Sequence, residues 1–288
     1  AELFSQIFLE LKQKALKPSL SGISSGFFDL DSFTQGFQKS DLIIIAGRPS
    51  MGKTALSLNI ASNIIKDSNL PVLFFSLEMS KEQLTYRLLT NETDITNLRL
   101  KTGNLYKEDW IKLNSTIKKL SGLPFFIDDT PSPSIPDIKS KIKKILFEQN
   151  QIGLIIIDYL QLMQNSKFKT ENRAQELSQI TRSLKNIARE FSVPIIALSQ
   201  LSRNVESRVN KRPVLSDLRE SGSIEQDADL VLMLYRESYY NSSESLENIN
   251  LIDNVELIIA KQRNGPVGTV DLHFDSSRTK FLNVDSIE

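Results

Sequence analysis

Residues 47–54 read Gly-Arg-Pro-Ser-Met-Gly-Lys-Thr, the G-x-x-x-x-G-K-[ST] pattern of a phosphate-binding P-loop. The apolar run 42–46 before it predicts a buried strand, and the residues from Ala55 onward repeat at helical spacing. A chance match within a glycine turn is the alternative interpretation, but the flanking strand and helix argue against it. The loop therefore predicts an α/β fold that binds a nucleoside triphosphate.

Each residue type in this loop has a physical reason to be there. Gly47 and Gly52 let the backbone curl so that its N–H groups point at phosphate oxygens. The helix that begins at Lys53 adds its dipole to the same anion site. Lys53 is expected to reach the β and γ phosphates, and the Thr54 hydroxyl is expected to hold Mg²⁺. The predicted nucleotide-binding residues are Gly47, Arg48, Pro49, Ser50, Met51, Gly52, Lys53 and Thr54.

The composition narrows the function classes. The 288 residues suffice for one large α/β domain or two small ones, and the net charge is zero. Contact with nucleic acid must then be local or shared among subunits. Without cysteine the chain has no disulfide framework or thiolate metal site, which suits a reducing compartment. No apolar run approaches 18 residues and no signal peptide is recognised, so no membrane span is expected. His273, the single histidine, is predicted to be structural rather than a metal ligand.

Apolar runs with strand character recur from residue 41 onward. They span residues 42–46, 72–76, 124–127, 154–158, 194–199, 230–235 and 255–260. Helical patterns lie between them, for example at 80–91, 135–149 and 172–191. Continuously apolar strands that alternate with helices predict a mostly parallel, doubly wound sheet with helices on both faces.

The two ends of the chain differ from this pattern. Residues 255–281 alternate around an Asn-Gly turn at 264–265, which predicts an antiparallel hairpin at the end of the sheet. The polar residues 236–254 are predicted to form a surface loop. Apolar residues at helical spacing within 1–16 predict an amphipathic helix. This helix either folds back on its own core or docks on a neighbouring subunit.

Polar residues end two further predicted strands. The apolar residues 153–157 run into Asp158, at the carboxyl end where α/β sheets hold ligands. Asp158 is therefore the predicted second group for Mg²⁺, and a plain strand-capping aspartate is the alternative. Gln200 closes the strand 194–199. A buried amide there would touch both the γ-phosphate and the following loop, and so report the nucleotide state to that loop.

Hydrolysis also needs a group that activates or orients water. Glu78 follows the strand 72–76, whose end is expected beside the P-loop. This makes Glu78 the candidate base. Ser80 with Gln83 also fits a simple helix capping box, so the spacing alone leaves both interpretations open.

Two basic stretches have two interpretations each. The segment 202–222 includes the cations Arg203, Arg208, Lys211, Arg212 and Arg219. It either tracks a phosphate backbone or forms a solvated loop. Lys261 and Arg263 are predicted at the tip of the C-terminal hairpin. They either reach the γ-phosphate of a neighbour as an arginine finger or belong to a plain charged turn.

Taken together, these motifs resemble the C-terminal ATPase domain of the DnaB-type replicative helicases, within the RecA-like P-loop ATPases. The matching segments cover almost the whole chain and are 47–54, 75–79, 127–131, 158–163, 198–203, 217–229 and 261–266. The resemblance implies a RecA-like P-loop NTPase core at 23–288, preceded by a linker helix and linker at 1–22. The helix would dock on the next subunit.

The resemblance also implies roles for single residues. Lys53 and Thr54 would hold the phosphates of ATP and Mg²⁺, with Asp158 supporting the metal ion. Glu78 would activate water and Gln200 would sense the γ-phosphate. Lys261 and Arg263 would reach into the adjacent subunit's site. The loop facing DNA would contain Arg219, Glu220 and Gly222.

The implied function is ATP-driven 5′-to-3′ movement along single-stranded DNA and unwinding of forked DNA by a homo-hexameric ring, in DNA replication. Primase and a helicase loader are implied partners, although the family's N-terminal domain, which supports primase binding, is not found before Ala1. The implied location is a bacterial cytoplasm or a plastid stroma. Another RecA-like ATPase and a non-enzymatic ring component are the competing interpretations. The segments 217–229 and 261–266 argue against the first, and Glu78 with Arg263 argues against the second.

Overall fold

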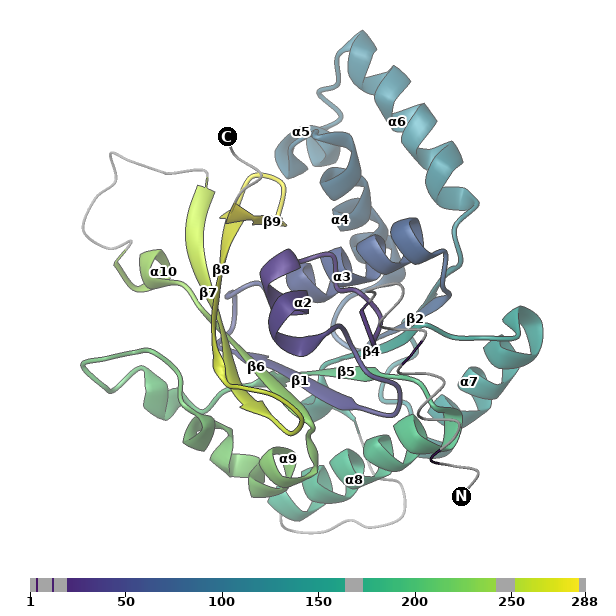
Figure 1. Cartoon of the computed structure of the whole chain (residues 1–288). Coiled ribbons are helices and arrows are strands. Elements are labelled where there is room, and N and C mark those ends of the chain that lie inside the picture. Colours follow the sequence, from purple (N-terminus) through teal and green to yellow (C-terminus); the bar gives the residue numbers. More distant parts are fainter. Residues whose placement is uncertain (1–3, 5–11, 13–19, 164–172, 242–251, 285–288) are drawn as a thin grey trace.

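The described residues of the computed structural model form one nine-stranded sheet with helices on both faces (Figure 1). They are residues 20–163, 173–241 and 252–284, together with Phe4 and Lys12. The sheet order is β3-β2-β4-β5-β1-β6-β7-β8-β9. The first six of these are parallel, and β7, β8 and β9 are antiparallel to their neighbours. The strands are β1 (Leu42–Gly47), β2 (Val72–Ser76), β3 (Phe125–Asp128), β4 (Leu154–Asp158), β5 (Ile195–Gln200), β6 (Leu230–Tyr235), β7 (Ile252–Gln262), β8 (Gly268–Asp275) and β9 (Lys280–Asn283).

The helices connect these strands and cover the sheet. The α-helices are α2 (Phe28–Thr34), α3 (Lys53–Ser68), α4 (Lys81–Thr93), α5 (Asn97–Thr102), α6 (Lys107–Ser121), α7 (Ile135–Gln149), α8 (Arg173–Phe191), α9 (Gly222–Asp227) and α10 (Glu237–Asn241). Three 3₁₀ turns are η1 (Leu160–Leu162), η2 (Arg203–Val205) and η3 (Leu215–Ser221). No described helix has the length and apolarity needed to cross a membrane.

Two apolar cores form because side chains alternate between the faces of a strand. In β1, Ile43 and Ile45 pack in one core with α3 and α4, while Leu42 and Ile44 pack in the other with α7 and α8. All four side chains are at most 1% exposed. The predicted doubly wound, mostly parallel sheet is therefore confirmed. It holds β1 in its middle, where the P-loop follows.

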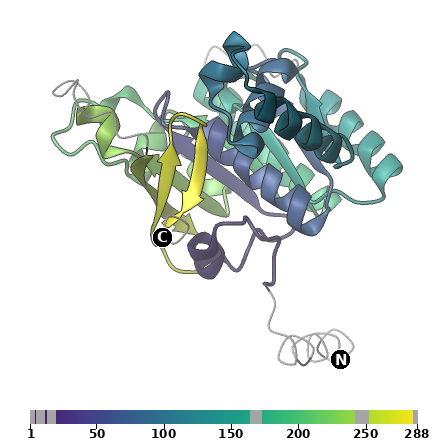
Figure 2. The ribbon, with the colours of Figure 1, turned by 90° about the horizontal axis from the view of Figure 1, so that it is seen from above.

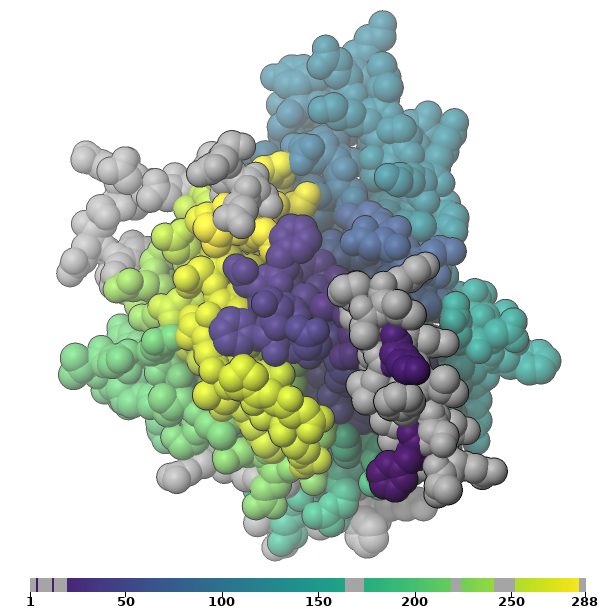
Figure 3. All heavy atoms as spheres, in the orientation of Figure 1, coloured from purple at the N-terminus to yellow at the C-terminus, as the bar shows by residue number. Residues whose placement is uncertain are grey.

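The C-terminal strands extend the sheet, as the Asn-Gly turn predicts. β7 and β8 pair antiparallel across residues 252–275, and β9 adds a third strand that the sequence patterns did not indicate. These strands, drawn in yellow in Figure 2, lie at the end of the sheet opposite β3. Figure 3 shows them beside α2, where Gln262 Nε2 donates to the Phe33 carbonyl at 3.2 Å.

The prediction of a surface loop over 236–254 is wrong at both ends. The helix α10 forms where the Tyr240 ring stacks on Tyr235, with centroids 6.2 Å apart. At the other end β7 begins at Ile252, and Asp253 pairs with Arg236. These contacts, one between near neighbours and one between Arg236 and Asp253, order residues whose polar composition alone indicated a loop. The N-terminal helix predicted within 1–16 lies outside the described residues except for Phe4 and Lys12.

Candidate functional site

Four parallel strands have their carboxyl ends side by side, in the order β2, β4, β5, β1. The register places Gly47 opposite Gln200 and Ser76 opposite Asp158, so the predicted polar residues converge. A cavity of about 630 Å³ opens there. Its lining is Pro49, Ser50, Gly52, Lys53, Thr54, Ala55, Glu78, Met79, Gln83, Arg87, Asp158, Tyr159, Gln200, Phe274 and Thr279.

The P-loop is held in the shape that its glycines allow. Gly52 has φ of 103°, and a Cβ atom there would lie 2.9 Å from Phe281 Cζ. Only glycine tolerates both this backbone and this approach. Gly52 also forms the N-cap of α3, so the amino end of a sixteen-residue helix points at the cavity. The geometry is that of an anion-binding loop.

Lys53 folds back over this loop. Its Nζ donates to the carbonyls of Gly47 at 2.9 Å and Arg48 at 3.1 Å. Burial lowers the pKa of Lys53 to about 8, and the carboxylates of Asp158 and Glu78 oppose that shift. The ammonium is thus held in a partly dehydrated site, where an anionic phosphate would restore the favourable surroundings of its charge.

Asp158 and Thr54 form the group expected to hold Mg²⁺. Thr54 Oγ1 donates to Asp158 Oδ2 at 2.7 Å, and Asp158 is 1% exposed. Burial raises the pKa of Asp158 to about 6, while the Thr54 hydrogen bond lowers it. One carboxylate and one hydroxyl fit Mg²⁺, which takes few protein ligands and completes its shell with water and phosphate oxygens. The described residues contain no cluster of three or more acidic, histidine or cysteine ligands.

Glu78 lies at the cavity and also precedes a capped helix. Ser80 accepts from the Gln83 amide at 3.3 Å, and the Gln83 side chain accepts from the Ser80 amide, which completes a capping box for α4. The capping interpretation of these two residues is therefore correct, but it leaves Glu78 available. The Glu78 side chain is exposed to the cavity beside Asp158 and Lys53.

Gln200 ends β5 within the same cavity, and Gln161 supports it from the neighbouring η1. Gln161 Nε2 donates to Ser199 Oγ at 3.1 Å and to the Gln200 carbonyl at 3.4 Å. The Gln200 amide lies 3.5 Å from Gln161 Oε1. These contacts fix the strand end from which the Gln200 side chain enters the cavity. Gln161 is a supporting residue that reasoning on strand ends alone did not indicate.

Arg87 is a cavity residue that the sequence prediction missed. It lies on α4 one turn after Gln83, and both side chains face the cavity. Burial lowers the pKa of Arg87, while Asp158 and Glu78 raise it. In the sequence, Arg87 is indistinguishable from a solvated helix charge, and only its spacing of four from Gln83 gave a signal. Phe274 and Thr279 also line the cavity and come from the distant C-terminal strands.

Not every P-loop side chain faces the cavity. Arg48 is 6% exposed, and its guanidinium donates to the Leu201 carbonyl and to Glu206, each at 2.8 Å. Met51 is 1% exposed in the apolar core. These two side chains therefore hold the loop to its surroundings, and any contact of Arg48 or Met51 with nucleotide falls to the backbone amides.

Lys261 and Arg263 lie toward the amino ends of the parallel strands, whereas the P-loop lies at their carboxyl ends. Lys261 pairs with Val231 near the start of β6, and the Arg263 amide donates to the Asp229 carbonyl at 2.8 Å. Asp229 pairs at that end with Leu42, five residues before Gly47. At about 3.3 Å per residue, the Arg263 backbone lies roughly 16 Å along the strands from its own loop, and the Lys261 backbone, which is level with Ile44, lies roughly 10 Å from it.

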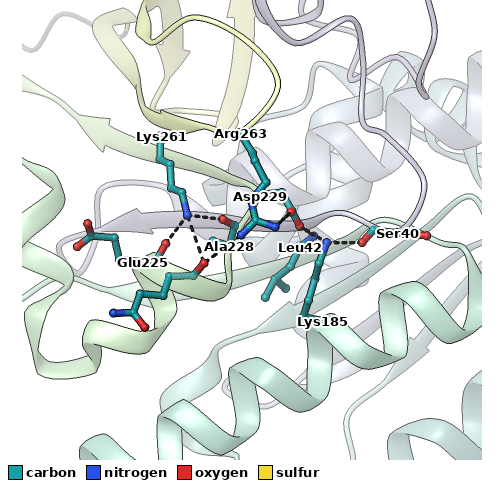
Figure 4. Close-up of polar contacts among 9 residues, drawn as sticks. Ser40, Leu42, Lys185, Glu225, Ala228, Asp229, Lys261 and Arg263 are labelled. Carbon is teal, nitrogen blue, oxygen red and sulfur yellow. Dashed lines mark hydrogen bonds and ion pairs between the residues drawn. The ribbon is translucent and has the colours of Figure 1, made fainter.

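Both cations contact their own chain (Figure 4). Lys261 Nζ donates to the carbonyls of Glu225 at 2.6 Å and Ala228 at 2.7 Å, at the end of α9. Arg263 Nη1 donates to Asp229 Oδ1 at 3.0 Å. The prediction that Lys261 lies at the hairpin tip is wrong, because it is paired within β7.

The segment predicted to face DNA spans η3 and α9. Arg219, Glu220 and Gly222 belong to these elements, and the side chains of Arg219 and Glu220 lie outside the described part of the chain. In the preceding stretch, Arg208 pairs with Asp217 at 2.6 Å. Arg212 pairs with Glu256 at 2.6 Å. These two cations are thus occupied within the chain.

Comparison with known proteins identifies the family. The family described as the DnaB-like helicase C-terminal domain matches residues 22–283. A probable replicative DNA helicase of Trieres chinensis is 71% identical over 282 residues, 98% of this chain and 62% of that relative. The chain therefore spans less than two thirds of that relative's length.

Solved structures agree with this assignment. A structure described as an ATPase domain has a TM-score of 0.90 and 40% identity, with 99% of each chain covered. A structure described as that of a DnaB-like replicative helicase and its interactions with primase has a TM-score of 0.88 and 40% identity. It covers 98% of this chain and 66% of that one. The family match covers residues 22–283, and the fold and the P-loop site agree with it. The chain therefore belongs to the DnaB-like helicase C-terminal domain family.

Proposed function

We propose that this chain is the ATPase motor of a replicative DNA helicase. ATP hydrolysis drives 5′-to-3′ movement along single-stranded DNA and unwinding of forked DNA by a homo-hexameric ring. The observation that carries the proposal is the split site. The P-loop, Asp158 and Glu78 lie at the carboxyl ends of the parallel strands, and the cations Lys261 and Arg263 lie toward the amino ends. A head-to-tail neighbour completes such a site.

Within one subunit, each residue has a separate task. The amides at the start of α3 and the Lys53 ammonium bind the phosphates. Thr54 and Asp158 hold Mg²⁺, which neutralises charge on the β and γ phosphates when it is bound. Glu78 orients a water molecule for in-line attack on the γ-phosphorus, and takes its proton. Gln200, held by Gln161, contacts the γ-phosphate and passes its presence to the loop after β5.

The neighbouring subunit supplies the remaining charge. Arg263, with Lys261 beside it, reaches the γ-phosphate of the adjacent site and stabilises the charge that develops on its oxygens. The half-exposed Arg263 side chain supports this role. Hydrolysis at a subunit boundary then changes the contact between two subunits, which is how it couples to movement.

DNA binding is assigned to the segment that contains Arg219, Glu220 and Gly222. Because the chain is neutral overall, copies of this segment converge on one channel to concentrate their contacts with phosphate. Such contacts read no sequence, so binding tolerates any single strand. A relative's structure is described with its interactions with primase, and primase and a loader are proposed partners of the complete protein. We assign residues 1–22 to the linker and 23–288 to the ATPase domain, in a bacterial cytoplasm or a plastid stroma.

Two substitutions test the shared site. Lys53→Ala should abolish ATP hydrolysis, because the phosphates lose their cation. Arg263→Ala should reduce kcat by about 10³-fold or more, as removal of an arginine finger does. Mixing the two variants should restore activity, because a Lys53→Ala subunit donates an intact Arg263 to the intact P-loop of its neighbour. Steady-state hydrolysis with single-stranded DNA measures this.

The mixing experiment has a matched control. The exposed Lys112→Ala variant should hydrolyse ATP at the normal rate alone, and should not rescue Arg263→Ala beyond the activity that its own subunits carry. Mixed rings of the two inactive variants that stay inactive would sink the assignment of Arg263 to the neighbour's site.

A further inference from the structure

Asp229 lies between the DNA-facing segment and the finger. It follows α9, precedes β6 and is 5% exposed. Its backbone carbonyl accepts from the Arg263 amide at 2.8 Å, and its Oδ1 accepts from Arg263 Nη1 at 3.0 Å. Arg263 Nη2 also donates to the Gln226 carbonyl at 3.2 Å. The guanidinium is therefore held at a fixed position along one side.

The rest of the guanidinium is accessible. Arginine has five side-chain N–H donors, and two of them bind described residues here. The Arg263 side chain is 50% exposed and lines a second cavity of about 630 Å³. An arginine held on one side and open on the other is pre-oriented for a second anion, because the planar fork loses little freedom on binding it.

A second cation keeps Asp229 compensated. Lys185, from α8, donates to Asp229 Oδ2, and the same oxygen accepts from the Leu42 amide at 2.8 Å. Lys185 is itself fixed, since its Nζ donates to the Ser40 carbonyl at 2.8 Å. A buried carboxylate with a single cation could not release it without being left uncompensated. Asp229 binds Arg263 through Oδ1 and Lys185 through Oδ2 (Figure 4). With Lys185 in place, Asp229 stays compensated when Arg263 turns to a phosphate.

We propose that Asp229, backed by Lys185, is a positioning residue that presents Arg263 to the nucleotide of the adjacent subunit. The inference rests on the proposed role of Arg263 in the neighbour's site. Asp229 contacts neither ATP nor Mg²⁺. It acts through Arg263, so its loss misplaces the finger and leaves the subunit's own cavity intact.

The first test is Asp229→Asn, which keeps the shape of the side chain and removes its charge. In assembled rings with single-stranded DNA, kcat should fall by about 10- to 100-fold, because a misplacement of about 1 Å can cost up to about 100-fold. The KM for ATP should stay within about twofold of the wild-type value, because the nucleotide binds at the P-loop, which Asp229 does not contact. Lys185→Met should lower kcat less, because Asp229 then retains Arg263 against the phosphate.

Two further arms separate positioning from damage to the fold. Mixing Asp229→Asn with Lys53→Ala should restore hydrolysis, because the Asp229→Asn subunit still has a working P-loop and receives a normal finger. In an Arg263→Ala background, Asp229→Asn should cause no additional loss of kcat, since residues that act as a unit are not additive. A structural defect would remain in the mixed rings and would add to the Arg263→Ala defect.

The proposal is overturned by unchanged kcat in Asp229→Asn rings, by a loss that Lys53→Ala subunits do not restore, or by additive losses. Arg263→Ala is assayed beside these variants and reports on the underlying function separately. If Arg263→Ala keeps full activity, the finger assignment itself fails. If Arg263→Ala is inactive and rescued while Asp229→Asn is normal, only the positioning role fails.

Discussion

At the scale of single residues, burial shifts the pKa of two groups that are proposed to bind ATP and Mg²⁺. Lys53 has its pKa lowered to about 8, and Asp158 has its pKa raised to about 6, in both cases chiefly through burial. ATP needs a charged ammonium, and Mg²⁺ needs an ionised carboxylate. The empty site therefore has both groups in the right state between about pH 6 and pH 8.

This window predicts the pH dependence of binding. ATP stabilises the charged form of Lys53 and raises its pKa, so binding takes up a proton when the free site has lost one. The Kd for non-hydrolysable ATP with Mg²⁺ should increase about tenfold per pH unit above pH 8. It should also increase below pH 6, as Asp158 becomes protonated. Equilibrium binding measured from about pH 5 to about pH 9.5 tests this. The Lys53→Arg variant, whose guanidinium stays charged, should lose the increase in Kd above pH 8 and keep the increase below pH 6.

At the scale of elements, the parallel strands and the P-loop could be predicted from the sequence, because local pattern decides them. The run 154–158 is apolar, ends in aspartate and forms β4 as predicted. Arg87 could not be predicted, since its role depends on how α4 packs over the cavity. Nor could β9, which is ordered by pairing with β8, or α10, where the Tyr240 ring stacks on Tyr235. Propensity has little influence on elements of four or five residues.

The link between α9 and β7 carries a prediction at the same scale. Lys261 binds the carbonyl of Glu225, in the last turn of α9, and the carbonyl of Ala228 just after it. Lys261→Met should remove these bonds and weaken α9 locally by about 1 kcal/mol. Amide hydrogen exchange over 222–228 should become several-fold faster. Lys112→Met, an exposed change on α6, should leave that exchange unaltered, and equal protection in both variants would contradict a tether.

At the scale of the whole molecule, the two halves of the proposed catalytic site lie at opposite ends of the parallel strands. The separation along the strands is roughly 16 Å, about five residues of extended backbone, which is more than one side chain spans. A lone subunit therefore has a nucleotide site without its finger. The six parallel strands fix this separation, so small movements of loops do not remove it.

Hydrolysis should consequently depend on assembly. The rate per subunit should rise cooperatively with protein concentration and be stimulated further by single-stranded DNA. Arg263→Ala should show a low rate at every concentration, although it still assembles. Hydrolysis measured over a dilution series beside light scattering tests this, and a constant rate per subunit through the dissociation range would count against a shared site.

The placement of Arg263 far from its own P-loop also determines how many complete catalytic sites a ring contains. In a head-to-tail array, every complete site belongs to a boundary between two subunits rather than to a subunit. A closed ring has as many boundaries as subunits, whereas an open one has one boundary fewer. Admitting a DNA strand through a gap therefore silences one site, and the gap itself marks which nucleotide cannot be hydrolysed until the ring closes.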